Sequence, residues 1–153
     1  MTVTLYTDAS FCNKRKVAAC GYIIMVSGEV IKHEIIIVSD CHTINDGEFL
    51  AAIKGIQEAY LQKGVVEIEF YTDSMSIIVF KNGIKAQRKP LAKEFSETME
   101  MLKEDGIIIN MHHVKGHSNN EYNTKVDKSC RKLLRSFLKE LTNERPFIIK
   151  RPY

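Results

Sequence analysis

The sequence predicts an α/β protein in which helices flank a mixed five-stranded sheet. Residues 2–38 contain three segments rich in β-branched and aromatic residues, and helical periodicity starts only near residue 45. Each later strand-like segment follows a helical one, so the expected order is β-β-β-α-β-α-α-β-α. This order excludes a doubly wound mononucleotide-binding fold, in which a helix directly follows the first strand.

The opening strands are expected at residues 2–7, 18–26 and 29–38. Ser27-Gly28 separates the second strand from the third, and a two-residue turn of this kind joins antiparallel neighbours. Apolar residues at helical spacing then predict a helix over 45–63, with Gly64 at its C′ position. The remaining elements are a strand at 65–72, helices at 74–81 and 90–105, a strand at 107–114, and a helix from the N-cap Asn123 to about residue 141.

Length and composition predict one domain over residues 1–153, with an extended tail at 145–153. Hydrophobic residues make up 44% of the chain, but no apolar run approaches the roughly 18 residues of a membrane span. The four cysteines lack C-x-x-C spacing, and the N-terminus lacks a secretory pattern. We therefore expect reduced thiols in a cytoplasmic protein, most simply a monomer, with no membrane partner.

Charge is distributed unevenly along the chain. Residues 1–110 hold 12 basic and 15 acidic residues, a net charge of −3, whereas residues 111–153 hold 10 basic and 4 acidic residues, a net charge of +6. A basic C-terminal third is typical of a protein with a polyanionic partner. It is also typical of a helix with a solvated basic face, and charge alone favours that simpler interpretation.

Two strands end in similar residues, Tyr6-Thr7-Asp8 and Tyr71-Thr72-Asp73. If the two strands are parallel neighbours, both aspartates lie at the same edge of the sheet, where two adjacent carboxylates need a cation or a shared proton. Glu48 heads a stripe of small residues on the first long helix, and Asp127 is expected in the first turn of the last helix. Turn formation explains either aspartate alone, and the helix dipole explains Glu48 or Asp127 alone.

Five motifs together resemble type 1 ribonuclease H, in the family's order and over residues 2–140. They are Thr7-Asp8-Ala9-Ser10, Asn45-Asp46-Gly47-Glu48, Thr72-Asp73-Ser74, Val114-Lys115-Gly116-His117, and Asn123 with Asp127. The resemblance implies the ribonuclease H-like fold and an endonuclease that hydrolyses the RNA strand of RNA–DNA hybrids. It also implies two Mg²⁺ ions, with Mn²⁺ as a possible substitute.

The resemblance assigns roles to particular residues. Asp8, Glu48, Asp73 and Asp127 would be the catalytic metal ligands, and His117 would assist proton transfer or product release. Ser10, Asn45, Ser74 and Lys115 would contact the substrate, with Asn45 near the 2′-OH that distinguishes RNA from DNA. Helix or turn capping is an equally good explanation for the two serines.

Phosphate contacts are expected from basic residues around this site. The candidates are Lys14, Arg15 and Lys16; Lys81, Lys85, Arg88 and Lys89; and Lys125, Lys128, Arg131, Lys132, Arg135 and Lys139. For the far end of the last group, a solvated helix face is the preferred interpretation. The chain departs from the family at Ala9, where glycine is usual, and it lacks a tryptophan-rich basic protrusion. Weaker hybrid binding, or help from a partner, is therefore expected.

Other functions stay open from the sequence. A protein of this fold can bind nucleic acid without turnover, but nothing structural requires four acids to converge. A nuclease of the same superfamily can also act on DNA junctions or structured RNA; Asn45 with Glu48 favours hybrid cleavage. A phosphoryl-transfer signalling domain with a strand-end aspartate is disfavoured by the three opening strands.

Overall fold

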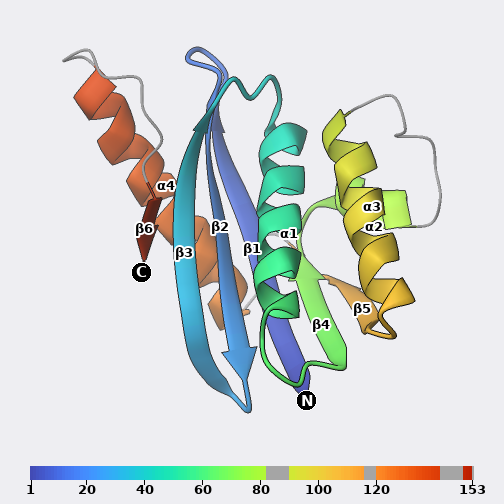
Figure 1. Cartoon of the computed structure of the whole chain (residues 1–153). Helices are drawn as coiled ribbons and strands as arrows, with labels where there is room; N and C mark the ends of the chain where they lie inside the picture. The colour runs from blue at the N-terminus through green and yellow to red at the C-terminus, as the bar shows by residue number, and fades with distance from the viewer. Residues whose placement is uncertain (82–89, 116–119, 142–149, 153) are drawn as a thin grey trace.

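A computed structural model describes residues 1–81, 90–115, 120–141 and 150–152 (Figure 1). The predicted strands and helices form in the predicted order, and a short strand follows them. The strands are β1 (Thr2–Cys12), β2 (Val17–Val26), β3 (Glu29–Ser39), β4 (Glu67–Thr72), β5 (Ile108–His113) and β6 (Lys150–Pro152). The helices are α1 (Ile44–Tyr60), α2 (Met75–Lys81), α3 (Pro90–Glu104) and α4 (Glu121–Leu141).

The sheet is mixed, and its strand order is β5-β4-β1-β2-β3-β6. The pairs β1–β2 and β2–β3 are antiparallel, as the Ser27-Gly28 turn predicts, whereas β1–β4 and β4–β5 are parallel. The predicted five-stranded sheet is thus confirmed. Part of the tail predicted as extended adds the sixth strand, because β6 pairs antiparallel with Glu34–Ile36 of β3.

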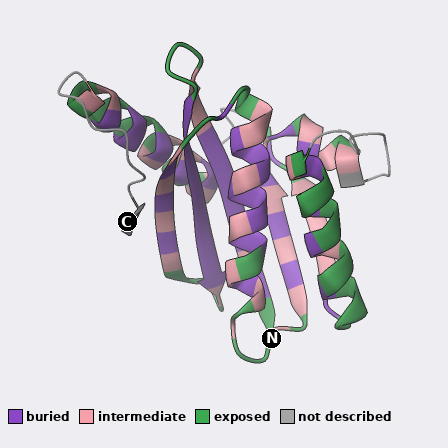
Figure 2. Ribbon diagram, turned by 45° about the horizontal axis from the view of Figure 1, so that its top comes forward, coloured by how far each residue is buried: buried purple, intermediate pink, exposed green. Residues whose placement is uncertain are grey.

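Helices cover both faces of the sheet. α1 and α3 lie on the near face in Figure 1, and α4 lies behind β1, β2 and β3. Buried residues concentrate in β1, β2 and the sheet-facing sides of α1 and α4 (Figure 2). One apolar cluster joins the sheet to α1 and α3, and a second joins it to α4. Among the described helices, none is both long and apolar enough to cross a membrane.

Small residues bring α1 close to the sheet, as the predicted stripe of Glu48, Ala52, Gly55 and Ala59 requires. A Cβ at Gly55 would lie 2.9 Å from both Leu5 Cδ1 and Thr7 Cγ2, so glycine is needed for this close approach. Ala52 and Ala59 are fully buried against the same face. This packing places the N-terminal turns of α1 beside β1.

Two predicted boundaries are wrong. β1 does not end at Thr7, because its pairing with β2 continues to Cys12↔Val17 after its pairing with β4 stops. Asp8 therefore lies inside a strand, opposite Gly21. α1 ends at Tyr60 with Leu61 as its C-cap, so Gly64, at φ +83°, belongs to the following turn rather than to the C′ position.

The start of α4 also differs from the prediction. The helix begins at Glu121, and the Asn120 side chain accepts hydrogen bonds from the backbone N–H groups of Tyr122 and Asn123. Asn120 therefore caps the helix, and Asn123 is a buried residue within it. Asp127 consequently lies in the second turn of α4 rather than in the first.

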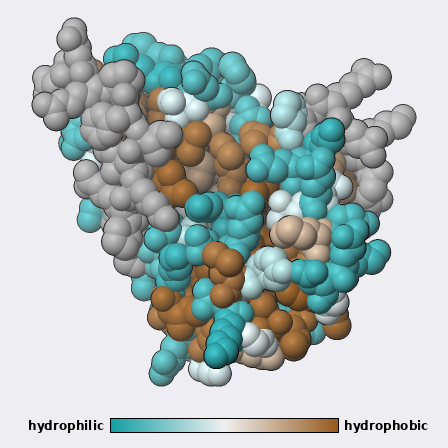
Figure 3. Space-filling model, viewed as in Figure 1, coloured by the Kyte–Doolittle hydropathy of each residue, from teal (hydrophilic) through white to brown (hydrophobic). Residues whose placement is uncertain are grey.

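Exposed apolar side chains gather at the end of the parallel strands where those strands begin (lower part of Figure 3). Met1, Val66 and Ile108 are lateral neighbours there. The Val66 N–H donates to Met1 O at 3.0 Å, and the Ile108 N–H donates to Val66 O at 3.1 Å. Asp8 and Asp73 lie toward the opposite end of these strands, so the apolar surface is separate from the carboxylates.

Candidate active site

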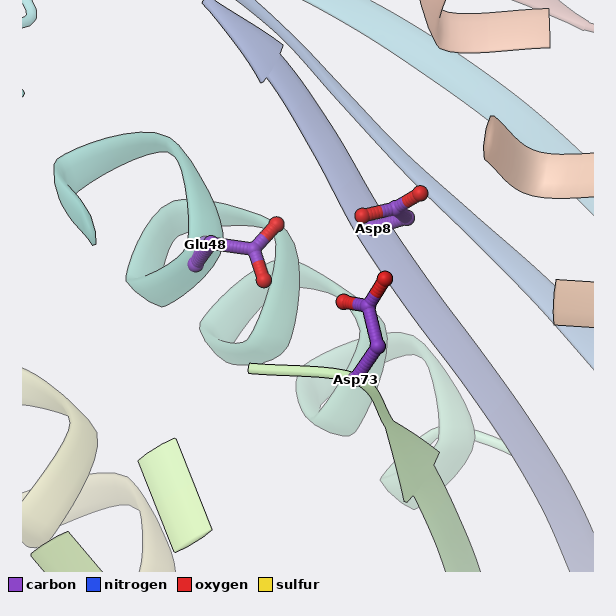
Figure 4. A group of neighbouring side chains, drawn as sticks. All are labelled: Asp8, Glu48 and Asp73. Atoms are coloured by element: carbon purple, nitrogen blue, oxygen red, sulfur yellow. The ribbon is translucent and has the colours of Figure 1, made fainter. Parts of the chain in front are cut away.

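Three acidic side chains from three different elements converge at one point. Asp8 comes from β1, Glu48 from α1, and Asp73 from the residue that follows β4 (Figure 4). One carboxylate oxygen from each lies within 4.8 Å of the others, and these three form a group able to hold a metal ion. The structure therefore brings together three of the four carboxylates singled out in the sequence.

The strand register places the two aspartates side by side. β1 and β4 are parallel, and their last paired residues are Tyr6 and Tyr71. These two rings stack with centroids 4.8 Å apart and an interplanar angle of 14°. Asp8 and Asp73 each lie two residues further along the chain. The stacked rings thus hold the two strands together just before the aspartates.

The start of α1 fixes the position of Glu48. Thr43 is the N-cap and forms a capping box with Asp46: the Thr43 hydroxyl accepts from the Asp46 N–H, and the Asp46 carboxylate accepts from the Thr43 N–H. Glu48 is buried, and the neighbouring Gly47 lies so close to the sheet that a Cβ there would meet Ala9 Cβ at 3.1 Å. The helix therefore cannot move away from β1 without losing this packing.

Burial and mutual repulsion disfavour ionisation of the three carboxyl groups. Burial, reinforced by the charge of Asp73, raises the pKa of Asp8 to about 8, despite a hydrogen bond of 2.9 Å from the Ala9 N–H. Burial and then Asp8 raise the pKa of Glu48 well above its usual range. Burial and then Asp127 raise the pKa of Asp73. A cation at this point would relieve all three shifts.

The donor atoms fit a divalent cation. Glu48 Oε1 is buried and has no hydrogen-bond partner among the described residues. Such an atom is costly to bury unless something else satisfies it. Carboxylate oxygens are the ligands that Mg²⁺ and Mn²⁺ accept readily in proteins. The unpartnered oxygen and the two adjacent aspartates are what a hard cation requires.

Asp127 borders this group without being one of the three. Its charge raises the pKa of both Asp8 and Asp73, so it faces the same space. Its carboxylate Oδ2, however, accepts a hydrogen bond from Arg131 at 2.7 Å, one turn further along α4. The side chain is 36% exposed. Asp127 is thus paired with the Arg131 guanidinium in this structure.

The predicted substrate-contacting residues differ in burial and in hydrogen bonding. Asn45 Oδ1 accepts a hydrogen bond of 3.0 Å from Ser76, and Ser10 lies half-buried in β1. Ser74 is buried, and its Oγ accepts from the Ile77 N–H at 3.4 Å, in keeping with helix capping. Lys115 is exposed after β5. His117, Lys85, Arg88 and Lys89 lie outside the described residues.

The sequence did not predict two features of α4. Arg131, a candidate phosphate contact, pairs with Asp127, and its four-residue spacing from Asp127 is the signal for an ion pair on a helix. Asn123 is buried, and its Oδ1 has no partner among the described residues. No pattern in the sequence distinguishes such a residue from an exposed cap.

The comparisons with known proteins agree with this geometry. The profile of the RNase H family matches residues 1–135. The ribonuclease H of Chlorobaculum parvum is 27% identical over 141 residues, covering 85% of this chain and 93% of the relative. The ribonuclease H of Caldanaerobacter subterraneus subsp. tengcongensis is 28% identical over 151 residues, covering 90% and 94%.

Solved structures show the same fold. The N-terminal RNase H domain of a Mycobacterium tuberculosis protein, solved as a fusion with maltose-binding protein, has a TM-score of 0.70 at 17% identity, covering 88% of this chain and 97% of that one. An RNase H1 named LC11, solved in complex with an RNA/DNA hybrid, has a TM-score of 0.67 at 20% identity, covering 86% and 99%.

Proposed function

This chain belongs to the ribonuclease H family, and we propose on that basis that it hydrolyses the RNA strand of RNA–DNA hybrids with two divalent metal ions. The observation that carries the proposal is the convergence of Asp8, Glu48 and Asp73 within 4.8 Å, with one buried Glu48 oxygen unpartnered. The hybrid bound to one of the solved relatives supports the substrate class.

The four acids have distinct parts in this proposal. Asp8, Glu48 and Asp73 would hold the ions, and Asp127, which pairs with Arg131 in this structure, would complete the ligand set. When bound, the two ions activate a water molecule and stabilise the leaving oxygen. Mg²⁺ is the proposed ion, with Mn²⁺ as a substitute, because all four ligands are hard oxygen donors.

The protein itself supplies position and charge. β1 and the packed start of α1 hold the carboxylates rigidly, so little reorganisation is needed when a phosphate arrives. Burial excludes water from Asp8 and Glu48, which strengthens their interaction with any cation. His117 is proposed to move a proton to or from the reacting oxygens. Asn45, Ser10, Ser74 and Lys115 are proposed to contact sugar or phosphate.

Cleavage of a labelled RNA–DNA hybrid tests the proposal directly. We expect the wild type with Mg²⁺ to cut only the RNA strand, and Asp73→Asn to lower the rate by at least about 100-fold, because a metal ligand is lost. Glu94→Gln is the matched control: Glu94 is exposed on α3 and far in sequence from the site. It should cleave like the wild type.

The substrate panel separates the alternatives. Single-stranded RNA, duplex DNA, a DNA junction and a structured RNA are assayed beside the hybrid, with Mg²⁺ and with Mn²⁺. Cleavage of a junction or structured RNA in place of the hybrid would assign a different nuclease activity. A folded protein that binds but cuts none of them would be a binding module. The single-domain organisation, cytoplasmic location and monomeric state stay predictions from the sequence.

A further inference from the structure

The solvent-facing side of α4 is covered by cations. Six basic residues point away from the sheet and are all exposed, whereas the opposite side of the helix is buried in the core. At about 100° per residue the six fall within an arc of about 120°. They extend over about 21 Å of helix. They are Lys125, Lys128, Arg131, Lys132, Arg135 and Lys139.

This basic face is costly for an isolated helix. Like charges three or four residues apart destabilise a helix by about 0.2–0.5 kcal/mol per pair. Six such pairs occur along this face. They are Lys125–Lys128, Lys128–Arg131, Lys128–Lys132, Arg131–Arg135, Lys132–Arg135 and Arg135–Lys139. A polyanion lying on the face would convert this repulsion into attraction.

Exposure to solvent does not by itself give a helix such a basic face, as α3 shows. On α3, Lys93 and Lys103 are mixed with four glutamates, and Lys93 pairs with Glu97 at 3.9 Å. On α4, one acid lies between Lys125 and Lys139, namely Asp127, which pairs with Arg131 and faces the carboxylate site. No described carboxylate lies within ion-pair distance of Lys125, Lys128, Lys132 or Arg135.

We propose that the basic face of α4 binds the phosphate backbone of nucleic acid, so that the bound substrate extends from the cleavage site along this helix. This inference rests on the proposed function for the identity of the polyanion, because α4 is the helix that brings Asp127 to the site. A nucleic acid at the carboxylates would therefore meet Lys125, Lys128 and Lys132 next. Residues 1–110 carry a net charge of −3, so the net positive charge of the chain comes from residues 111–153.

A lipid surface fits this helix poorly. Helices that lie on membranes insert an exposed apolar side into the lipid, next to their basic side. The apolar side of α4 is occupied, because Val126, Cys130, Leu133, Leu134 and Phe137 are buried against the sheet. Charge without an accessible apolar side favours nucleic acid over a bilayer.

Salt-dependent binding of a labelled hybrid tests the proposal without requiring catalysis. Affinity is measured by fluorescence anisotropy in EDTA over a series of salt concentrations. The test variant is Lys128→Gln/Lys132→Gln/Arg135→Gln, which spares the Arg131–Asp127 pair. The control is Lys63→Gln/Lys93→Gln/Lys103→Gln, which removes the same charge from exposed positions after α1 and on α3. Thermal unfolding of each variant confirms folding; the test variant should match or exceed the wild-type Tm.

We expect the test variant to lower the slope of log K against log salt by about 3 and the control by less than about 1. Equal losses in both variants would reflect overall charge and would overturn the proposal, as would a wild-type slope in the test variant. Competition by anionic vesicles or polyglutamate as effective as by hybrid would also overturn it. Cleavage with Mg²⁺ is scored separately, so that a failed activity is not mistaken for a failed binding surface.

Discussion

Asp8 and Asp73 each lie two residues beyond the paired and stacked Tyr6 and Tyr71, which belong to the parallel neighbouring strands β1 and β4. This arrangement forces two carboxylates together at a buried point where Glu48 adds a third. The resulting repulsion is the physical property from which the behaviour of the site follows.

The metal-free protein should become less stable as pH rises. The folded-state pKa of Asp8, raised from 3.8 to about 8, exceeds its unfolded value, so the folded state retains a proton that the unfolded state releases. The stability contribution is complete below about pH 4 and is lost as pH rises through about 8. The pKa shifts of Glu48 and Asp73 act in the same direction.

Thermal unfolding in EDTA between pH 5 and pH 8 measures this effect. Asp8→Asn cannot ionise, so it should flatten the decline and raise the Tm at pH 8 by about 4–8 °C, corresponding to about 2 kcal/mol. Glu94→Gln should follow the wild-type curve. A wild-type Tm that increases over this pH range would contradict the explanation.

Removing Arg131 should strengthen metal binding. An ion entering beside Asp127 must displace the Arg131 guanidinium, which lies 2.7 Å from the carboxylate. An exposed helical pair of this spacing contributes about 0.3–0.5 kcal/mol, so Arg131→Gln should raise Mn²⁺ affinity about twofold by calorimetry. Arg135→Gln removes the same charge without a carboxylate partner and serves as the control. Equal affinities in the two variants would show that the pair does not compete with the ion.

Gly55→Ala should destabilise the protein although alanine favours helices. The added Cβ would lie 2.9 Å from Leu5 Cδ1 and Thr7 Cγ2, and overpacking costs about 1–3 kcal/mol against about 1 kcal/mol gained in helix propensity. We expect a Tm lower by about 2–4 °C. Gln57→Ala, at an exposed position of the same helix, should leave the Tm unchanged. A more stable Gly55→Ala variant would mean that α1 moves freely away from β1.

The C-terminal strand should contribute to stability. β6 pairs with Glu34–Ile36 of β3 and covers that edge of the sheet. A chain ending at Glu144 should therefore unfold at least about 2 °C below the full-length chain. Lys150→Ser/Arg151→Ser, which keeps the chain length and the backbone pairing, serves as the control. An unchanged Tm after truncation would show that the pairing contributes nothing measurable.

Local sequence determined the elements and most of the chemistry. Alternation and helical spacing are properties of short segments. They therefore predicted the order of strands and helices, the Ser27-Gly28 turn and the small-residue stripe of α1. The repeated Tyr-Thr-Asp residues predicted that Asp8 and Asp73 would meet, because parallel strands in register align equivalent positions. The family followed from five motifs in order.

Tertiary structure decided what depends on distant partners. β1 extends to Cys12 because β2 continues to pair with it, and Asn120 caps α4 although Asn123 is the same residue type nearby. Glu48 is buried and Asp127 is not because α1 lies against the sheet at Gly47 and Gly55, whereas Asp127 turns toward Arg131. The burial of Glu48 arises from contacts between segments far apart in the chain, and such contacts leave no local pattern. The Asp127–Arg131 pair, by contrast, joins residues one helical turn apart, and its spacing is visible in the sequence.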